Sequence, residues 1–133
     1  MTNLIVSAAL IFALHGAESD MRHHSKSGDH GRAHGVLQIH SKVLHDVDRI
    51  YGLHYTQKST EREDTAEEIC RLYLQYYGKE YKEHTGKPPS DEVLARIWNG
   101  GPTGYRKHRT KRYWTRRVQP YVKDYEKAHG KKR

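Results

Sequence analysis

An apolar segment near the start of the chain constrains the fold more than any other feature. Between residues 3 and 18 apolar side chains fall on nearly every side of a helix, at Leu4, Ile5, Ala8, Ala9, Ile11, Phe12 and Leu14. A helix of that kind is buried on most of its surface. The segment therefore predicts a central core helix, and it places Glu18 at the rim of that core.

The same segment superficially resembles the apolar core of a signal peptide. It is too short to span a bilayer as a helix, no Lys or Arg precedes it, and secretory leaders normally begin with positive charge. Cleavage near Ala17 would also leave Glu18 at a new N-terminus. We therefore expect no transmembrane segment and no convincing signal peptide, with a cleaved leader as the alternative.

Length and cysteine content indicate one domain without a disulfide framework. A chain of 133 residues is long enough for one substantial core. The prediction is a single domain over residues 1–133, with residues 129–133 as a frayed basic tail. The one cysteine, Cys70, cannot form an internal disulfide, and its helical setting favours a buried apolar role over a nucleophilic one.

Later apolar stripes predict further helices and no regular strands. We expect a helix from Val36 to Gly52, a long helix capped by Asp64 or Thr65, and a short helix capped by Ser90. A last helix begins at Thr110 and kinks or breaks at Pro120. The fold class is mainly α, with room for a small hairpin in the loop over residues 20–35.

The net charge of +8 and the pI near 9.6 indicate a polyanionic partner. Nucleic acid, anionic lipid and bacterial cell wall all fit that charge. The run YRKHRTKRYWTRR over residues 105–117 interleaves cations with aromatic rings, as grooves for single-stranded nucleic acid do. No recognised nucleic-acid-binding motif accompanies it, so we expect no specific nucleic acid.

The segment from Glu18 to His40, ESDMRHHSKSGDHGRAHGVLQIH, carries the candidate chemistry. An acid ends the apolar helix, a Gly-containing loop holds a second acid at Asp29, and GVLQI re-enters the core. Two carboxyls in different environments can protonate a leaving oxygen and activate a water. The alternatives are an ordinary helix-terminal Glu, an Asp in a simple turn, and Asp20 as a competing second acid.

Two motifs in this chain resemble those of goose-type lysozymes and soluble lytic transglycosylases. In those enzymes a Glu-Ser pair ends a helix and a G-x-x-Q-[IV] segment follows about twenty residues later, as in GDHGRAHGVLQI here. The segment LARIWNGGPTG at 94–104 is similar to their Ala-Tyr-Asn-x-Gly-x-Gly stretch. The resemblance covers roughly residues 13–118 and implies a compact lysozyme-like helical domain.

The resemblance also implies an activity, which is cleavage of the β-1,4 bond between N-acetylmuramic acid and N-acetylglucosamine in peptidoglycan. Glu18 would be the general acid and Asp29 would hold or deprotonate the attacking water. The implied contacts with the glycan or a chitooligosaccharide are Gln38, Trp98, Asn99, Gly100 and Tyr105. Trp98 stands where the family has Tyr, and Tyr105 is the candidate for the missing hydroxyl.

Two departures keep other functions open. His40 occupies the place of a further family acid, so a mechanism relying on Glu18 alone is an alternative. That mechanism is the lytic transglycosylase reaction, which forms a 1,6-anhydro product. A non-catalytic basic protein that binds glycan or nucleic acid is the alternative from another class.

The histidines in the first half of the chain suggest a metal site only weakly. His23 and His24 with His30 and His34 are the possible ligands, but no HExxH motif occurs and Cys70 lies far away in sequence. We expect no metal and no organic cofactor. We also expect a monomer that acts outside the cytoplasm, as a secreted, periplasmic or phage-delivered protein.

Overall fold

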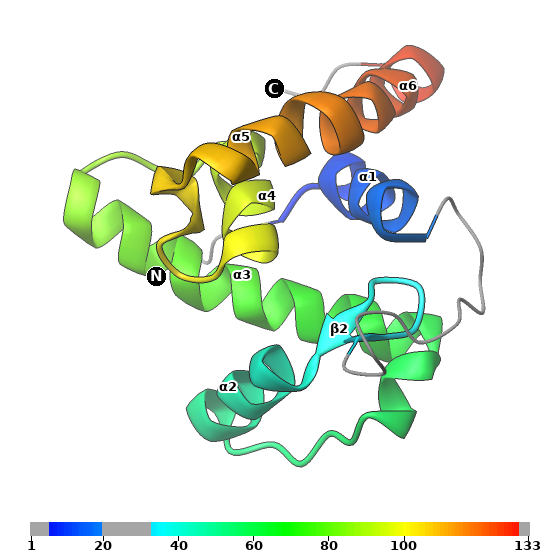
Figure 1. Ribbon diagram of the computed structural model, residues 1–133, viewed down its shortest axis with the longest axis vertical. Coiled ribbons are helices and arrows are strands. Elements are labelled where there is room, and N and C mark those ends of the chain that lie inside the picture. The colour runs from blue at the N-terminus through cyan, green and yellow to red at the C-terminus, as the bar shows by residue number, and fades with distance from the viewer. Residues whose placement is uncertain (1–5, 20–32, 131–133) are drawn as a thin grey trace. The chain divides into compact units, whose positions relative to one another are not determined.

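The computed structural model describes residues 6–19 and 33–130, and its elements are almost all helical (Figure 1). The α-helices are α1 (Ala8–Ser19), α2 (Ser41–Tyr51), α3 (Glu63–Thr85), α4 (Asp91–Gly100), α5 (His108–Tyr113) and α6 (Gln119–His129). Shorter helical turns are η1 (Lys58–Glu61), η2 (Gly104–Arg106) and the π-helical η3 (Trp114–Val118). Strands β1 (Ala33–His34) and β2 (Ile39–His40) form one small hairpin. The prediction of a mainly α fold is confirmed.

The chain divides into two compact units that share the long helix α3. Unit 1 consists of Met1–Ala17 with Leu74–Arg133, and unit 2 consists of Glu18–Tyr73. Helix α1 ends two residues past the first boundary, at Ser19, and α3 continues across the second. That the whole chain behaves as one domain stays a prediction.

In unit 1 the apolar segment forms the core helix that its sequence predicts. Leu10 and Leu14 of α1 are completely buried. Phe12 packs against the rings of Tyr121 and Tyr125 in α6, with ring centroids 6.3 Å and 5.4 Å apart. Gly16 makes this approach possible, because a Cβ there would lie 2.6 Å from the Tyr121 ring. The missing side chain thus lets α6 lie directly against α1.

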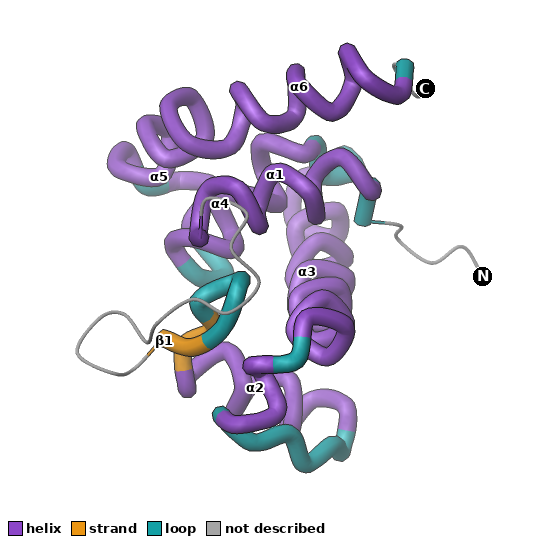
Figure 2. Tube along the Cα trace, turned by 90° about the vertical axis from the view of Figure 1, so that its right-hand side faces the viewer, coloured by secondary structure: helices purple, strands orange, loops and turns teal. Residues whose placement is uncertain are grey.

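The second half of unit 1 confirms two expectations and corrects one. Ser90 caps α4, since its hydroxyl accepts a hydrogen bond of 3.2 Å from the Val93 N–H. The break expected near Pro120 is the π-helical turn Trp114–Val118. It joins α5 to α6 in one continuous helical segment, or rod (Figure 2). The last helix begins at His108 and not at Thr110. Thr110 is buried inside α5, where its hydroxyl lies 2.6 Å from the Gly104 carbonyl oxygen.

In unit 2 the helix predicted from Val36 is wrong, because residues 33–40 form the hairpin. Ala33 pairs with His40 and His34 with Ile39. Gly35 and Gln38 both have positive φ, at 78° and 48°, and a right-handed helix cannot pass through such residues. A side chain at Gly35 would also overlap with the carbonyl group of Thr60. The hairpin therefore begins inside the loop over residues 20–35 in which it seemed possible and extends to His40, and α2 starts only at Ser41.

The hairpin nevertheless buries the apolar residues that suggested a helix. Val36, Leu37 and Ile39 are fully buried together with Val47 of α2 and Ile69 of α3. Gly52 ends α2 in the left-handed conformation, as expected. The Tyr51 hydroxyl then donates a hydrogen bond of 2.9 Å to the Leu72 carbonyl, which fastens α2 to α3. Among the described helices none is both long and apolar enough to cross a membrane.

Candidate active site

Glu18 lies in the last turn of α1 and is half-buried. Its neighbour Ser19 is 2% exposed, so the helix end is embedded in the surrounding structure. The carboxylate acts on Cys70 of α3: burial raises the pKa of the Cys70 thiol, and the negative charges of Glu18 and Glu67 raise it further. Glu18 thus lies close enough to Cys70 for its charge to act on the thiol, and its side chain is only partly exposed. Cys70 is fully buried, as the sequence predicts.

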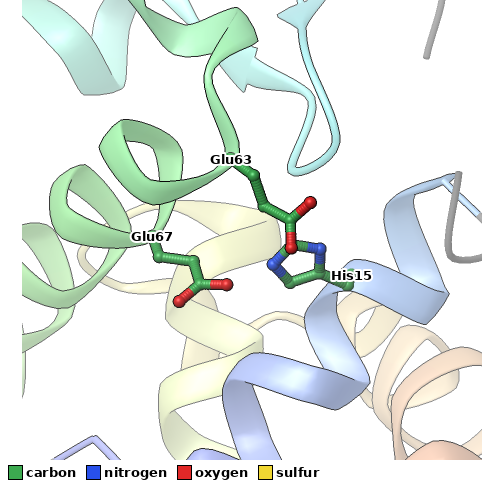
Figure 3. Close-up of side chains that lie close together, drawn as sticks. All are labelled: His15, Glu63 and Glu67. Atoms are coloured by element: carbon green, nitrogen blue, oxygen red, sulfur yellow. The ribbon is translucent and has the colours of Figure 1, made fainter. Parts of the chain in front are cut away.

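The first turns of α3 add two further carboxylates to unit 2. Glu63 and Glu67 are one helical turn apart, and their side chains project from the same side of α3 (Figure 3). Their carboxylate oxygens lie within 4.8 Å of one another. Two carboxylates from one helix supply fewer ligands than a divalent cation requires, so this pair alone does not define a metal centre. His15, labelled in the same figure, is buried in α1.

Gln38 has a structural task in the hairpin. Its side-chain amide donates a hydrogen bond of 2.8 Å to the Gly35 carbonyl oxygen, and its own backbone N–H donates to the same oxygen at 3.0 Å. These bonds close the turn and hold Gln38 at its positive φ of 48°. The hydrogen bonds of Gln38 to Gly35 thus hold the loop, and its contact with a glycan stays a prediction.

The segment Trp98–Gly100 forms the C-terminal end of α4. Trp98 is only 8% exposed, which favours a packing role over a broad platform for a sugar ring. The side-chain oxygen of Asn99 accepts a hydrogen bond of 3.2 Å from Arg109. Gly100 approaches Thr110 closely, because a Cβ there would lie 2.7 Å from the Thr110 methyl group. The motif therefore brings the end of α4 against α5.

Tyr105 follows in η2 and is half-buried. Its ring packs edge-on against Tyr81 of α3, with centroids 4.8 Å apart and an interplanar angle of 89°. Part of the Tyr105 ring is thereby in contact with the protein. Any substrate contact by Tyr105 would use the remaining edge and the hydroxyl.

The sequence-predicted residues belong to different parts of the structure. Unit 2 holds Glu18 and Gln38, and unit 1 holds Trp98, Asn99, Gly100 and Tyr105. The candidate base Asp29, its competitor Asp20 and the possible metal ligands His23, His24 and His30 lie outside the described residues. His34 belongs to strand β1.

A charged cluster between α4 and α5 was not singled out from the sequence. Glu92 accepts hydrogen bonds of 2.9 Å from Arg96 and from Lys111. Arg96 also donates to the Thr110 hydroxyl at 3.0 Å and to the Lys107 carbonyl at 3.1 Å. Burial alone would raise the pKa of Glu92, but the two cations outweigh it and the net effect lowers that pKa. The i,i+4 spacing of Glu92 and Arg96 on one helix predicts their ion pair, but not the contact with Lys111.

Comparisons with known proteins agree on the fold. No protein-family model and no curated protein sequence matches the chain. A chain in the crystal structure of Aeromonas hydrophila PliI in complex with Meretrix lusoria lysozyme is 27% identical, with a TM-score of 0.68 over 99% of this chain and 100% of that one. An inhibitor-bound lysozyme from Meretrix lusoria is 26% identical, with a TM-score of 0.69 over 96% of each chain. Tapes japonica lysozyme is 24% identical, with a TM-score of 0.63 over 82% of this chain and 85% of that one.

These similarities confirm part of the resemblance drawn from the two motifs. The fold is lysozyme-like along nearly the whole chain. The likeness to goose-type lysozymes in particular, and to lytic transglycosylases, stays a prediction. The protein is therefore a mainly α chain with a lysozyme-like fold.

Proposed function

We propose that this protein is a muramidase that hydrolyses the β-1,4 bond between N-acetylmuramic acid and N-acetylglucosamine in peptidoglycan. The proposal is supported by the lysozyme-like fold and by the place of Glu18 in it. A half-buried glutamate at the end of a core helix is a suitable proton donor, because partial removal from water favours the protonated form.

In the proposed mechanism Glu18 donates its proton to the glycosidic oxygen as the bond to the anomeric carbon breaks. Asp29 takes a proton from a water, or orients it, as that water attacks the same carbon. Both groups are regenerated when the product leaves and protons return from solvent. Gln38, Trp98, Asn99, Gly100 and Tyr105 are the proposed glycan contacts, and Gln38 also holds the hairpin turn.

The chemistry requires no metal or organic cofactor in this proposal. The substrate is the bacterial wall, so the protein would act outside the cytoplasm as a monomer. The net charge of +8 suits such a substrate, because peptidoglycan bears carboxylate groups on its peptides.

Two other functions are distinguishable by experiment. A lytic transglycosylase would use Glu18 first as acid and then as base, and the muramic acid O6 would replace water as the nucleophile. A non-catalytic protein with this fold would bind walls without cleaving them.

The decisive experiment compares wall clearing by the wild-type protein, by Glu18→Gln and by the matched variant Glu80→Gln. Glu80 is another half-buried glutamate on a helix. Loss of a general acid lowers rates by roughly 10²–10⁴-fold, so Glu18→Gln should lose nearly all clearing while Glu80→Gln keeps it. Equal clearing by Glu18→Gln and wild type would remove Glu18 from the mechanism.

The products separate the two enzymatic reactions. Mass spectrometry of the released muropeptides should show reducing N-acetylmuramic acid ends. N-acetylmuramic acid ends that are lighter by the mass of one water would show the 1,6-anhydro product and would reject hydrolysis. Wall binding by the wild type without any clearing would favour the non-catalytic function.

A further inference from the structure

The strongest surface feature that the proposed mechanism does not use is a stretch of cations over residues 106–117, here named the cationic ribbon. It contains five arginines and two lysines, and no residue from 93 to 123 is acidic. All seven cationic side chains are exposed. The ribbon belongs entirely to unit 1, where it follows η2, α5 and η3.

The partners of these cations leave most of their charge uncancelled. Of the seven cations in the ribbon, only Lys111 pairs with a carboxylate of the described residues. That carboxylate belongs to Glu92, which also pairs with Arg96. Lys107 and Arg117 donate to the backbone carbonyls of Gly100 and Ala17, and Arg109 donates to the amide oxygen of Asn99. Such neutral acceptors orient a cation without neutralising it.

Three arginines of the ribbon have no partner within the described part of the chain, namely Arg106, Arg112 and Arg116. Arg112 and Arg116 are four residues apart on the rod formed by α5 and η3, so they project toward neighbouring points on its outer surface. The inner surface of the same rod buries Thr110, Tyr113, Trp114 and Val118. The two guanidinium groups are thus presented outward by a firmly packed helix.

The burial pattern also argues against two of the partners that the charge alone would allow. Proteins that bind single-stranded nucleic acid stack bases on exposed aromatic rings, but Tyr113 and Trp114 are 9% and 8% exposed. Helices that insert into membranes present apolar side chains beside their cations. The exposed residues over 106–117 are cationic apart from His108 and Thr115. The ribbon therefore offers charge, without exposed aromatic rings for bases or apolar side chains for lipid tails.

We propose that the cationic ribbon binds a linear phosphodiester polymer without bases, such as a poly(glycerol phosphate) chain attached to a bacterial wall. Arginine predominates in the ribbon, and its planar fork pairs with phosphate oxygens through two parallel hydrogen bonds. The choice of a wall polymer rests on the proposed muramidase function, because such a polymer lies on the same surface as the glycan. Docking there would concentrate the enzyme on its substrate.

The test measures binding of soluble poly(glycerol phosphate) by calorimetry, so it requires no catalysis. The wild type and Glu18→Gln should bind equally, which separates this proposal from the muramidase proposal. The double variant Arg112→Gln/Arg116→Gln should bind at least tenfold more weakly. Its log–log salt dependence should be shallower by about 1.4, since each lost phosphate contact removes about 0.7 from the slope.

The matched control is Lys42→Gln/Lys58→Gln, which removes the same charge from exposed positions of unit 2. It should weaken binding less than twofold, and circular dichroism should show all variants folded. If both double variants lost the same polymer affinity, the binding would depend on net charge and not on the ribbon, and the proposal would be overturned. Absence of polymer binding, tighter binding to single- or double-stranded oligonucleotides, or tighter binding to anionic vesicles would overturn it as well.

Discussion

Tyr55 illustrates how one side chain makes stability depend on pH. It is half-buried and its hydroxyl donates a hydrogen bond to the Glu68 carboxylate. Burial and this bond to Glu68 raise the pKa of Tyr55 to about 12. A raised pKa in the folded state means that the neutral phenol is stabilised by folding.

The resulting prediction concerns the variant Tyr55→Phe under alkaline conditions. The stability difference between wild type and variant should be constant below the ordinary tyrosine pKa of 10 and should shrink as the pH rises toward about 12. Urea unfolding at several alkaline pH values measures that difference. A difference that stays the same through this range would show that the Tyr55 phenol is not perturbed.

Gly104 is a second residue whose effect is local and steric. A Cβ at this position would overlap with the carbonyl oxygen of Arg96, and it would lie 3.3 Å from the Cα of Ile97. Both atoms belong to the backbone of α4, which cannot move aside without disturbing the buried Ile97.

We expect Gly104→Ala to lower the free energy of unfolding by about 2–4 kcal/mol through this overlap. The control is Gly101→Ala, where no atom lies within 4 Å but φ is 87°. That variant should lose about 1–2 kcal/mol from backbone strain alone. Chemical denaturation compares them, and an equal or smaller loss for Gly104→Ala would contradict the steric explanation.

At the scale of elements, the Glu92 cluster fastens α5 to α4. The carboxylate binds Arg96 on its own helix and Lys111 on α5. Glu92→Gln should therefore cost about 1–2 kcal/mol at neutral pH, the usual contribution of a partly buried charge-assisted hydrogen bond.

The pH dependence of that loss follows from the lowered pKa of Glu92. A depressed folded-state pKa gives stability that is present above the unfolded pKa of about 4.5 and disappears as the pH falls through the folded value. Thermal unfolding should show a large difference between Glu92→Gln and wild type at pH 7 and a smaller difference at pH 3. The exposed Glu83→Gln serves as the control and should change little at either pH.

The helices show how far hydrophobic periodicity predicts this fold. The stripes in α1, α3 and α4 were long or well capped, so the sequence identified them and the Ser90 cap. The segment Val36–Ile39 is apolar enough to resemble a helix start. The positive φ of Gln38 depends on a hydrogen bond to Gly35, and no periodicity reveals it. The start of α5 at His108, two residues before Thr110, is not predictable either, because the burial of Thr110 depends on contacts with Gly104 and Arg96.

The candidate site was less predictable than the helices. Glu18 stands out in the sequence because it ends an apolar helix; the structure shows it half-buried, and its catalytic role stays a prediction. Trp98 and Gln38 were selected by motif, yet their visible contacts are packing and turn closure. Contacts between different helices, such as that of Lys111 with Glu92, join residues nineteen positions apart. The spacing of residues in the sequence does not reveal such pairs.

At the scale of the whole molecule, the chain carries a natural reporter in each unit. Both tryptophans, Trp98 and Trp114, belong to unit 1, and the single cysteine, Cys70, belongs to unit 2. Cys70 is fully buried, and burial raises the pKa of its thiol, so it should not react with thiol reagents until unit 2 opens.

We expect the two units to unfold together, because α3 supplies buried residues to both. Ile69 and Leu74 lie in the same helix on either side of the boundary, and both are fully buried. Tryptophan fluorescence and Cys70 labelling, followed through one urea titration, should give the same midpoint. Midpoints that differ clearly would show two separately unfolding units and would contradict the single-domain prediction.

The π-helical turn Trp114–Val118 has a consequence for how the chain length can vary. Such a turn is equivalent to one residue inserted into an α-helix. Removing one residue there would restore regular winding and leave the residues beyond it on their present faces. Tyr121 and Tyr125 would then keep their contacts with Phe12. Deletions are usually tolerated in loops, and this turn is a point inside a helical segment where the chain could lose one residue and still keep that aromatic contact.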